Sequence, residues 1–86
     1  MTFKLSNHAR EEMERRSIPW SLLEDVLHNP QQIVRERGDL KVYQSVVDFG
    51  EKRRFLLRAI LNDTVDPALV ITVYRTSKID KYWRPA

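Results

Sequence analysis

The sequence predicts an α+β domain in which two N-terminal helices pack on one face of an antiparallel sheet of three or four strands. Before residue 30, apolar residues recur at helical spacing. From residue 31 the spacing of apolar residues changes to two, and short turn sequences separate runs rich in β-branched residues. The sequence contains no internal repeat, low-complexity segment or linker. Residues 1–86 are therefore expected to form a single domain.

The first helix is predicted to begin at Ser6 or Asn7, since either side chain can accept a hydrogen bond from the first turn. It runs to about residue 16, with Ala9 and Met13 on its inward face. Its charged residues form two expected i,i+4 pairs, Glu11–Arg15 and Glu12–Arg16. Such pairs are typical of a solvated helix face.

A second helix is predicted from Pro19, because proline fits the first turn of a helix. It carries one apolar stripe, made of Leu22, Leu23, Val26 and Leu27. Asn29 and Pro30 end it.

The remaining elements are predicted to be strands. Residues 3–5 form a brief edge strand or a lead-in. One further strand begins at Ile33, and three more span residues 40–49, 53–61 and 68–76. In the last strand, alternation places Leu69, Ile71 and Val73 on one face and Val70, Thr72, Tyr74 and Thr76 on the other. One face is thus apolar, and the other becomes polar towards the end of the strand.

The composition excludes several kinds of covalent link and metal site. There is no cysteine, so disulfides and thiolate metal sites are excluded, and two histidines alone cannot close a zinc site. No metal or cofactor is therefore expected. The sequence has no apolar segment of the length of a signal peptide or a membrane span, which predicts a cytoplasmic protein without a membrane partner.

Positive charge is concentrated in the strand region and the tail. Overall, 15 Lys and Arg face 12 Asp and Glu, for a formal charge of +3. Residues 1–28 carry four basic and five acidic side chains, whereas residues 35–58 carry seven and four, and residues 74–84 carry four and one. This distribution favours a polyanionic partner on the sheet side of the molecule.

Two helices followed by an antiparallel sheet, in a short basic chain, resemble the RelE/ParE superfamily of bacterial toxins, and several short motifs resemble an uncharacterised subgroup of that superfamily. These motifs are Ser6-Asn7-His8-Ala9, which gives an S-x-H-A start, then Met13, Arg16, Ile18 and Asn29-Pro30. The resemblance implies a domain of unknown function with a RelE/ParE-like fold. RelE-like members cut messenger RNA, usually on the ribosome, ParE-like members inhibit gyrase, and each is neutralised by a cognate antitoxin protein.

RNA cleavage without a metal requires fixed positive charge for the phosphate in the transition state. Arg54 and Arg58 share a strand face at about 13 Å, given ~3.3 Å per residue, and could hold two positions along an RNA backbone. The alternative is a pair of solvated arginines. Leu56 and Ile60 on the same face indicate that part of it is covered by the tail or by a partner.

The candidate catalytic residues are His8, Arg54, Arg58, Tyr74 and Arg75. A histidine side chain suits proton transfer, so His8 is a candidate acid or base, but a local role at the helix start fits it equally well. Glu12 could orient His8, and the two could form a metal pair only with a third ligand. Tyr74 could donate a proton or stack on a base, or it could be structural. His28 is expected to interact with its helix terminus.

The candidate RNA-binding residues are Lys41, Tyr43, Lys78, Lys81 and Tyr82. Cations bind phosphates and aromatic rings stack on bases, so the basic and aromatic tail is the most suggestive cluster. The alternative is a tail that docks on the core through Ile79 and Trp83. The alternation in the second long strand does not decide which face carries Lys41 and Tyr43.

These observations together favour the toxin of a type II toxin–antitoxin system that acts as a metal-independent endoribonuclease. Its expected partners are RNA, possibly on the ribosome, and an antitoxin laid over the apolar and basic surface. The alternatives are a ParE-like gyrase inhibitor, a module of the same fold that binds nucleic acid or protein without cleavage, and an inactive relic.

Overall fold

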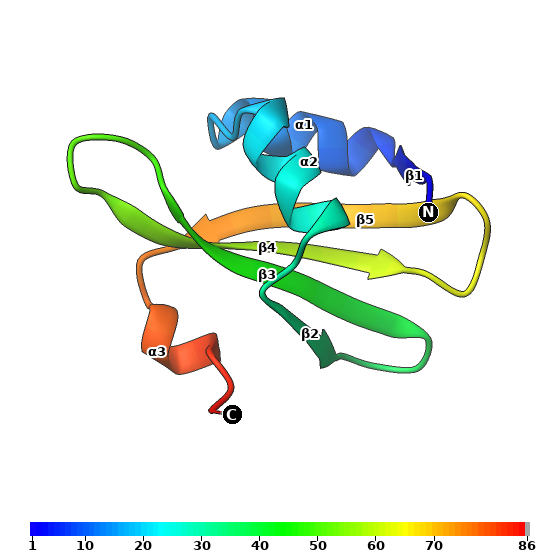
Figure 1. Cartoon of the computed structure of the whole chain (residues 1–86). Coiled ribbons are helices and arrows are strands. Elements are labelled where there is room, and N and C mark those ends of the chain that lie inside the picture. Colours follow the sequence, from blue (N-terminus) through cyan, green and yellow to red (C-terminus); the bar gives the residue numbers. More distant parts are fainter. Residues whose placement is uncertain (86) are drawn as a thin grey trace.

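The computed structural model describes residues 1–85, which form a five-stranded sheet and three short helices (Figure 1). The elements in chain order are β1 (Phe3–Leu5), α1 (Asn7–Arg15), α2 (Trp20–His28), β2 (Gln32–Arg35), β3 (Leu40–Asp48), β4 (Arg54–Asn62), β5 (Ala68–Thr76) and α3 (Ile79–Tyr82). Within these residues, no helix has both the length and the apolar character required to cross a membrane.

The sheet is mixed, with the strand order β1-β5-β4-β3-β2. Strands β2 to β5 form an antiparallel meander, whereas β1 pairs with β5 in parallel, with Phe3 opposite Ala68. The prediction of a purely antiparallel sheet of three or four strands is therefore wrong. A three-residue run such as Phe3–Leu5 shows too little periodicity to reveal its partner or its direction, because the connection through the rest of the fold decides both.

The helices lie on both faces of the sheet, which also differs from the prediction. Helix α1 packs against β5 and α2 packs against β3 and β4, whereas α3 lies on the opposite side (Figure 1). Helix α3 has only four residues, too few to produce an apolar stripe. The prediction of a two-helix layer described the N-terminal half and missed the third helix.

The main core lies between the sheet and the two N-terminal helices. Its buried members come from both layers: Ala9, Ile18, Leu23, Val26, Leu27, Tyr43, Leu57, Ala59, Leu61, Ala68, Val70 and Val73. Leu23 and Leu27 supply the apolar stripe of α2, and Leu57, Ala59 and Leu61 alternate along β4 as expected for one face of a strand. We call this face of the sheet the helix side and the other the tail side.

A β-bulge in β5 changes the faces of that strand. Ile60 pairs with Thr72 and Leu61 pairs with Val70, so Ile71 has no partner in the ladder. The extra residue moves Val70 to the helix side, where it is fully buried, and the predicted grouping of Val70 with Thr72 is wrong. Ser6 fixes the bulge, because its hydroxyl donates to the carbonyl of Ile71 at 2.8 Å.

Candidate functional site

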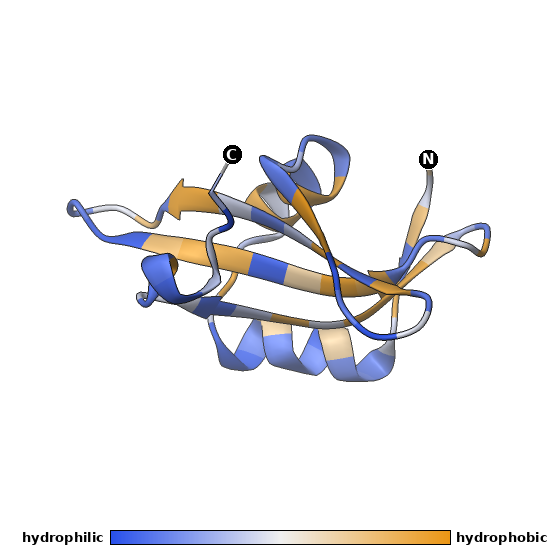
Figure 2. Cartoon of the chain, turned by 90° about the horizontal axis from the view of Figure 1, so that it is seen from below, coloured by the Kyte–Doolittle hydropathy of each residue, from blue (hydrophilic) through white to orange (hydrophobic). Residues whose placement is uncertain are grey.

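The candidate site is built around Arg58, in the middle of the central strand. Arg58 is the only charged residue between Phe55 and Leu61, and Figure 2 shows the central strand as apolar with one hydrophilic break. In the ladder, Arg58 lies opposite Gln44 of β3 and Tyr74 of β5. All three side chains therefore extend to the tail side. Only 7% of the surface of Arg58 is exposed.

Two strands and the tail contact the guanidinium group of Arg58. Its Nε donates to Oε1 of Gln44 at 2.8 Å, and an Nη1 hydrogen is donated to the hydroxyl of Tyr74. The guanidinium carbon lies 4.3 Å from the ring centroid of Tyr82 and 5.6 Å from that of Tyr74. The cation is thus held by neutral oxygen atoms and by the faces of two aromatic rings.

No carboxylate in residues 1–85 forms an ion pair with Arg58. Buried cations are usually paired with an anion, because removing a charge from water is costly. Hydrogen bonds and aromatic contacts offset part of this cost but leave the positive charge uncompensated. The environment of Arg58 therefore suits an anionic ligand such as a phosphate.

Two glutamines connect Arg58 to the tail. Gln44 is fully buried, and its Nε2 donates to Oε1 of Gln32 at 2.8 Å and to the carbonyl of Tyr82 at 3.2 Å. Gln32 donates to the carbonyl of Arg84 at 2.5 Å and accepts from the Arg84 amide at 3.1 Å. We call Gln32 and Gln44 the glutamine clamp. It fixes the tail over the sheet through backbone atoms of the tail.

A cavity of about 490 Å³ opens beside this cluster, between β3, β4 and α3. Its apolar wall includes Ile79 and Trp83 from the tail, and its polar rim includes Arg54. The complete lining is Gln31, Val46, Val47, Asp48, Arg54, Ile79, Asp80 and Trp83. The cavity gives solvent and small solutes access to the edge of the tail.

Five of the predicted site residues lie at or near Arg58. Tyr74 and Tyr82 contact it directly, and their rings meet edge to face at 6.4 Å. Lys81 places its Nζ 5.3 Å from the Tyr82 ring, and Lys78 is exposed at the start of the tail. Arg54 lines the neighbouring cavity and is exposed. The tail docks on the sheet, as the second interpretation of its sequence expected, and its lysines face solvent.

Arg75 lies on the opposite face from Arg58. In the ladder it is opposite Leu57, a core residue of the helix side. Its guanidinium stacks on Phe49 at 4.5 Å and on Phe55 at 4.8 Å. The sheet separates Arg75 from Tyr74 because consecutive strand residues point to opposite faces.

His8 is likewise distant from the Arg58 cluster. It is exposed in the first turn of α1, on the helix side of the sheet. Glu12, which the sequence offered as its partner, instead binds two arginines. The structure therefore does not bring His8 together with Arg58.

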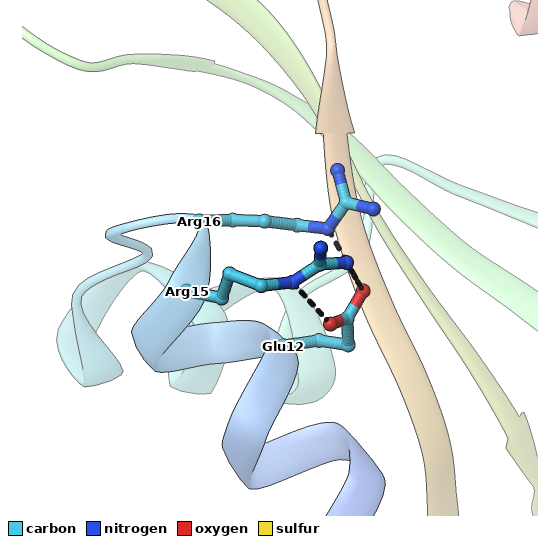
Figure 3. Close-up of polar contacts among 3 residues, drawn as sticks. All are labelled: Glu12, Arg15 and Arg16. Atoms are coloured by element: carbon cyan, nitrogen blue, oxygen red, sulfur yellow. Dashed lines mark hydrogen bonds and ion pairs between the residues drawn. The ribbon is translucent and has the colours of Figure 1, made fainter.

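Glu12 is the centre of an ion cluster at the end of α1 (Figure 3). Arg15 donates to both of its oxygens, at 2.8 and 2.7 Å, and Nε of Arg16 donates at 3.1 Å. The hydrogen bond from Arg15 is the main cause that lowers the pKa of Glu12 to about 2, against partial desolvation, with Arg16 adding to the effect. The expected Glu12–Arg16 pair forms. Arg15, which was expected to pair with Glu11, pairs with Glu12 instead.

Lys41 and Tyr43 form a separate cluster around Asp63, on the helix side. The hydroxyl of Tyr43 donates to Asp63 at 2.7 Å, and Nζ of Lys41 lies 3.1 Å from the same carboxylate. Burial, together with the Asp63 contact, raises the pKa of Tyr43 to about 12. The hydrogen bond from Tyr43 and the nearby Lys41 lower the pKa of Asp63. These two predicted RNA-binding residues therefore stabilise the fold at a place remote from Arg58.

The sequence interpretation did not select the glutamine clamp. One signal was available, since Gln44 interrupts an apolar strand, and a polar residue at a buried strand position needs a partner. The role of Gln32 depends on the tail folding back across β2, which local sequence does not reveal.

A comparison with known protein families gives one match. The family model described as "Domain of unknown function (DUF4258)" matches residues 5–75. The matched region includes Gln44, Arg58 and Tyr74 and ends before α3. Neither the curated proteins nor the solved structures gave a match.

Proposed function

The chain belongs to the DUF4258 family of domains of unknown function, and we propose that it binds RNA at Arg58 and cleaves it without a metal ion, as the toxin of a RelE-like toxin–antitoxin pair. The observation that carries this proposal is the buried guanidinium of Arg58, which has aromatic and amide neighbours but no carboxylate partner within residues 1–85. Such a group is suited to the negative charge of a phosphodiester.

The chemistry would be transfer of the phosphate within the RNA. The 2′-oxygen of the ribose forms a bond to phosphorus, the bond from phosphorus to the 5′-oxygen breaks, and the products carry a 2′,3′-cyclic phosphate and a 5′-hydroxyl. The 2′-hydroxyl loses a proton to solvent water, and the leaving 5′-oxygen gains one. Arg58 would stabilise the extra charge on the phosphate oxygens.

Tyr74 is the proposed proton donor to the leaving oxygen. Its hydroxyl accepts a hydrogen bond from Arg58, so its own hydrogen is free to point to a phosphate held by that arginine. Lys78, Lys81 and Arg54 are exposed around the site and would attract neighbouring phosphates. The ring of Tyr82 occupies a place at which a base could stack on the guanidinium.

The test is induced expression followed by mapping of transcript ends. Wild-type protein should slow growth and produce new ends with 2′,3′-cyclic phosphates, and purified protein should cleave RNA in the presence of EDTA, with or without ribosomes. Arg58→Lys should abolish both effects. Arg75→Lys is the matched control, because it changes an arginine of β5 that stacks on the other face of the sheet. Intact RNA under all these conditions would refute the nuclease proposal.

A second candidate is RNA or protein binding without cleavage, including ParE-like inhibition of gyrase. The position of His8 favours it, because the one histidine in a sequence motif lies across the sheet from Arg58. Loss of the growth effect in Arg58→Lys with unchanged RNA ends in wild type would support this candidate.

The proposed protein partner is a cognate antitoxin. An apolar recess of about 500 Å³ on the helix side supports such a partner, since it includes Met13 and the exposed ring of Trp20. Co-purification with the product of an adjacent reading frame tests this proposal, and a monomer unchanged in size by that product would count against it.

A further inference from the structure

The C-terminal tail, residues 77–85, covers the buried cation of the site. Helix α3 lies on the tail side of the sheet (Figure 1). The Tyr82 ring is the nearer of the two rings that stack on Arg58. A ligand that stacks on this part of the guanidinium would meet Tyr82 first. Arg58 is therefore buried by a segment at the end of the chain and not by the main core alone.

The tail is held by few contacts. Within residues 1–85, one polar link lies at the start of the tail, where the Lys78 amide donates to Oγ1 of Thr76 at 3.1 Å, and the others run through the glutamine clamp: Gln44 to the Tyr82 carbonyl, and Gln32 to the carbonyl and amide of Arg84. Within residues 1–85, no ion pair joins the tail to the sheet. Neutral hydrogen bonds each contribute about 1 kcal/mol, so a tail held in this way can open at modest cost.

From these contacts we propose that the tail is a displaceable cover, which the glutamine clamp holds over Arg58 and which a phosphodiester ligand replaces. The phosphate of the ligand binds the guanidinium of Arg58, and a base stacks where the Tyr82 ring lay. Lys78 and Lys81 move with the displaced tail. The cover keeps an uncompensated cation from binding anions of low affinity. The identity of the ligand rests on the proposed function, whereas the covering of Arg58 does not.

Gln44 is central to this cover because its side-chain amide contacts both Arg58 and the tail. The same amide group accepts from Arg58 through Oε1 and donates to the tail and to Gln32 through Nε2. Since the amide cannot rotate without losing these bonds, the position of the tail and the orientation of the guanidinium are coupled.

The test weakens the bonds that hold the tail over the sheet and leaves Arg58 itself unchanged. Gln32→Leu removes both bonds to Arg84, and Gln31→Leu is the matched control, since the side-chain oxygen of Gln31 accepts from the Val46 amide of β3. Two measurements need no RNA: hydrogen exchange of the tail amides, and the rate at which phenylglyoxal modifies Arg58, read by mass spectrometry. Exposed Arg54, on the same strand, is the internal reference.

In wild type, Arg58 should react much more slowly than Arg54. Gln32→Leu should raise the rate at Arg58 and the exchange of the tail amides by about 30-fold, as expected for the loss of two hydrogen bonds of ~1 kcal/mol each, and should leave Arg54 unchanged. It should also tighten binding of a short single-stranded RNA, and RNA added to wild type should release the tail amides. If Gln32→Leu fails to fold, Tyr82→Ala removes the stacked ring without touching the strands, and should also expose Arg58.

Two results would overturn the proposal that the tail covers Arg58. One is equal reactivity of Arg58 and Arg54 toward phenylglyoxal in wild type. The other is fast hydrogen exchange of the tail amides in Gln32→Leu while Arg58 stays protected. Absence of RNA binding in every variant, with Arg58 exposed as expected in Gln32→Leu, would instead refute the proposed function and leave the covering of Arg58 established.

Discussion

The guanidinium of Arg58 lies 4.3 Å from the ring of Tyr82, so the centre of the sheet and the end of the chain meet at one charged group. Tyr74 completes the contact from the neighbouring strand through its hydroxyl. Because one tyrosine contributes a ring and the other a hydrogen-bonding hydroxyl, their roles can be separated by substitution.

Tyr74→Phe should separate cleavage from binding. The ring and its stacking remain, but the proton proposed for the leaving oxygen is lost, so the cleavage rate should fall about 100-fold. RNA affinity should change by only about tenfold, as expected for one hydrogen bond to a charged group of ~1.5 kcal/mol. Single-turnover cleavage and equilibrium binding measure the two effects. Tyr43→Phe, on the other face, should cleave normally, and an equal loss of binding and cleavage in Tyr74→Phe would assign Tyr74 to the positioning of Arg58.

Ser6→Ala should destabilise the fold by about 1–2 kcal/mol, because one hydroxyl serves two elements. It caps α1 by accepting from the Ala9 amide at 3.0 Å, and it donates to the bulge carbonyl of Ile71. Denaturant unfolding measures the change. Ser21→Ala, at an exposed position of α2, should alter the free energy of unfolding by less than about 0.5 kcal/mol. Equal effects of the two substitutions would contradict the role assigned to Ser6.

Glu12 should make stability depend on acid pH. Its folded pKa of about 2 lies below the ordinary value of 4.5, so its contribution is present above pH 4.5 and is lost as the pH falls towards 2. The melting temperature of wild type should therefore fall more steeply between pH 5 and pH 2, the range set by these two values, than that of Glu12→Gln. Parallel curves for the two proteins would show that Arg15 and Arg16 do not hold the carboxylate in solution.

Tyr43 should produce a matching loss of stability in alkali. Its folded pKa of about 12 exceeds the ordinary value of 10, so its contribution is complete below pH 10 and is lost as the pH rises to 12. Tyr43→Phe should cost about 1 kcal/mol at neutral pH, through the lost bond to Asp63, and should weaken the alkaline decline. Unfolding followed by circular dichroism across this range provides the measurement. If Tyr43→Phe loses stability in alkali as steeply as wild type, groups other than Tyr43 cause that loss.

Sequence patterns were most informative where an element is long and has a regular apolar period. The strand expected at residues 68–76 agrees with β5, and the expected helices differ from α1 and α2 by a residue or two at each end. Periodicity determines these elements because burial of one face selects the period. The sheet type was wrong because the direction of β1 depends on its distant partner β5.

Two local features explain two of the errors, one in the faces of β5 and one in the candidate site. The bulge at Ile71 shifts the earlier part of β5 to the other face, and a single inserted residue of this kind does not alter composition or spacing enough to be recognised. Arg75 was grouped with Tyr74 by proximity in sequence, although neighbours on a strand point to opposite faces. Strand alternation and the aromatic tail together indicated the residues that the structure does bring into contact, Arg58 with Tyr74 and Tyr82.

The two outermost strands are also the shortest, with three residues in β1 and four in β2, whereas each of the three inner strands has nine. A strand from another molecule could form only a few backbone hydrogen bonds along either margin. The central strand β4 pairs with β3 along residues 54–62 and with β5 along residues 56–62, so it offers little free edge as a template for growth. This arrangement keeps the central strand from stacking into extended sheets with copies of the protein.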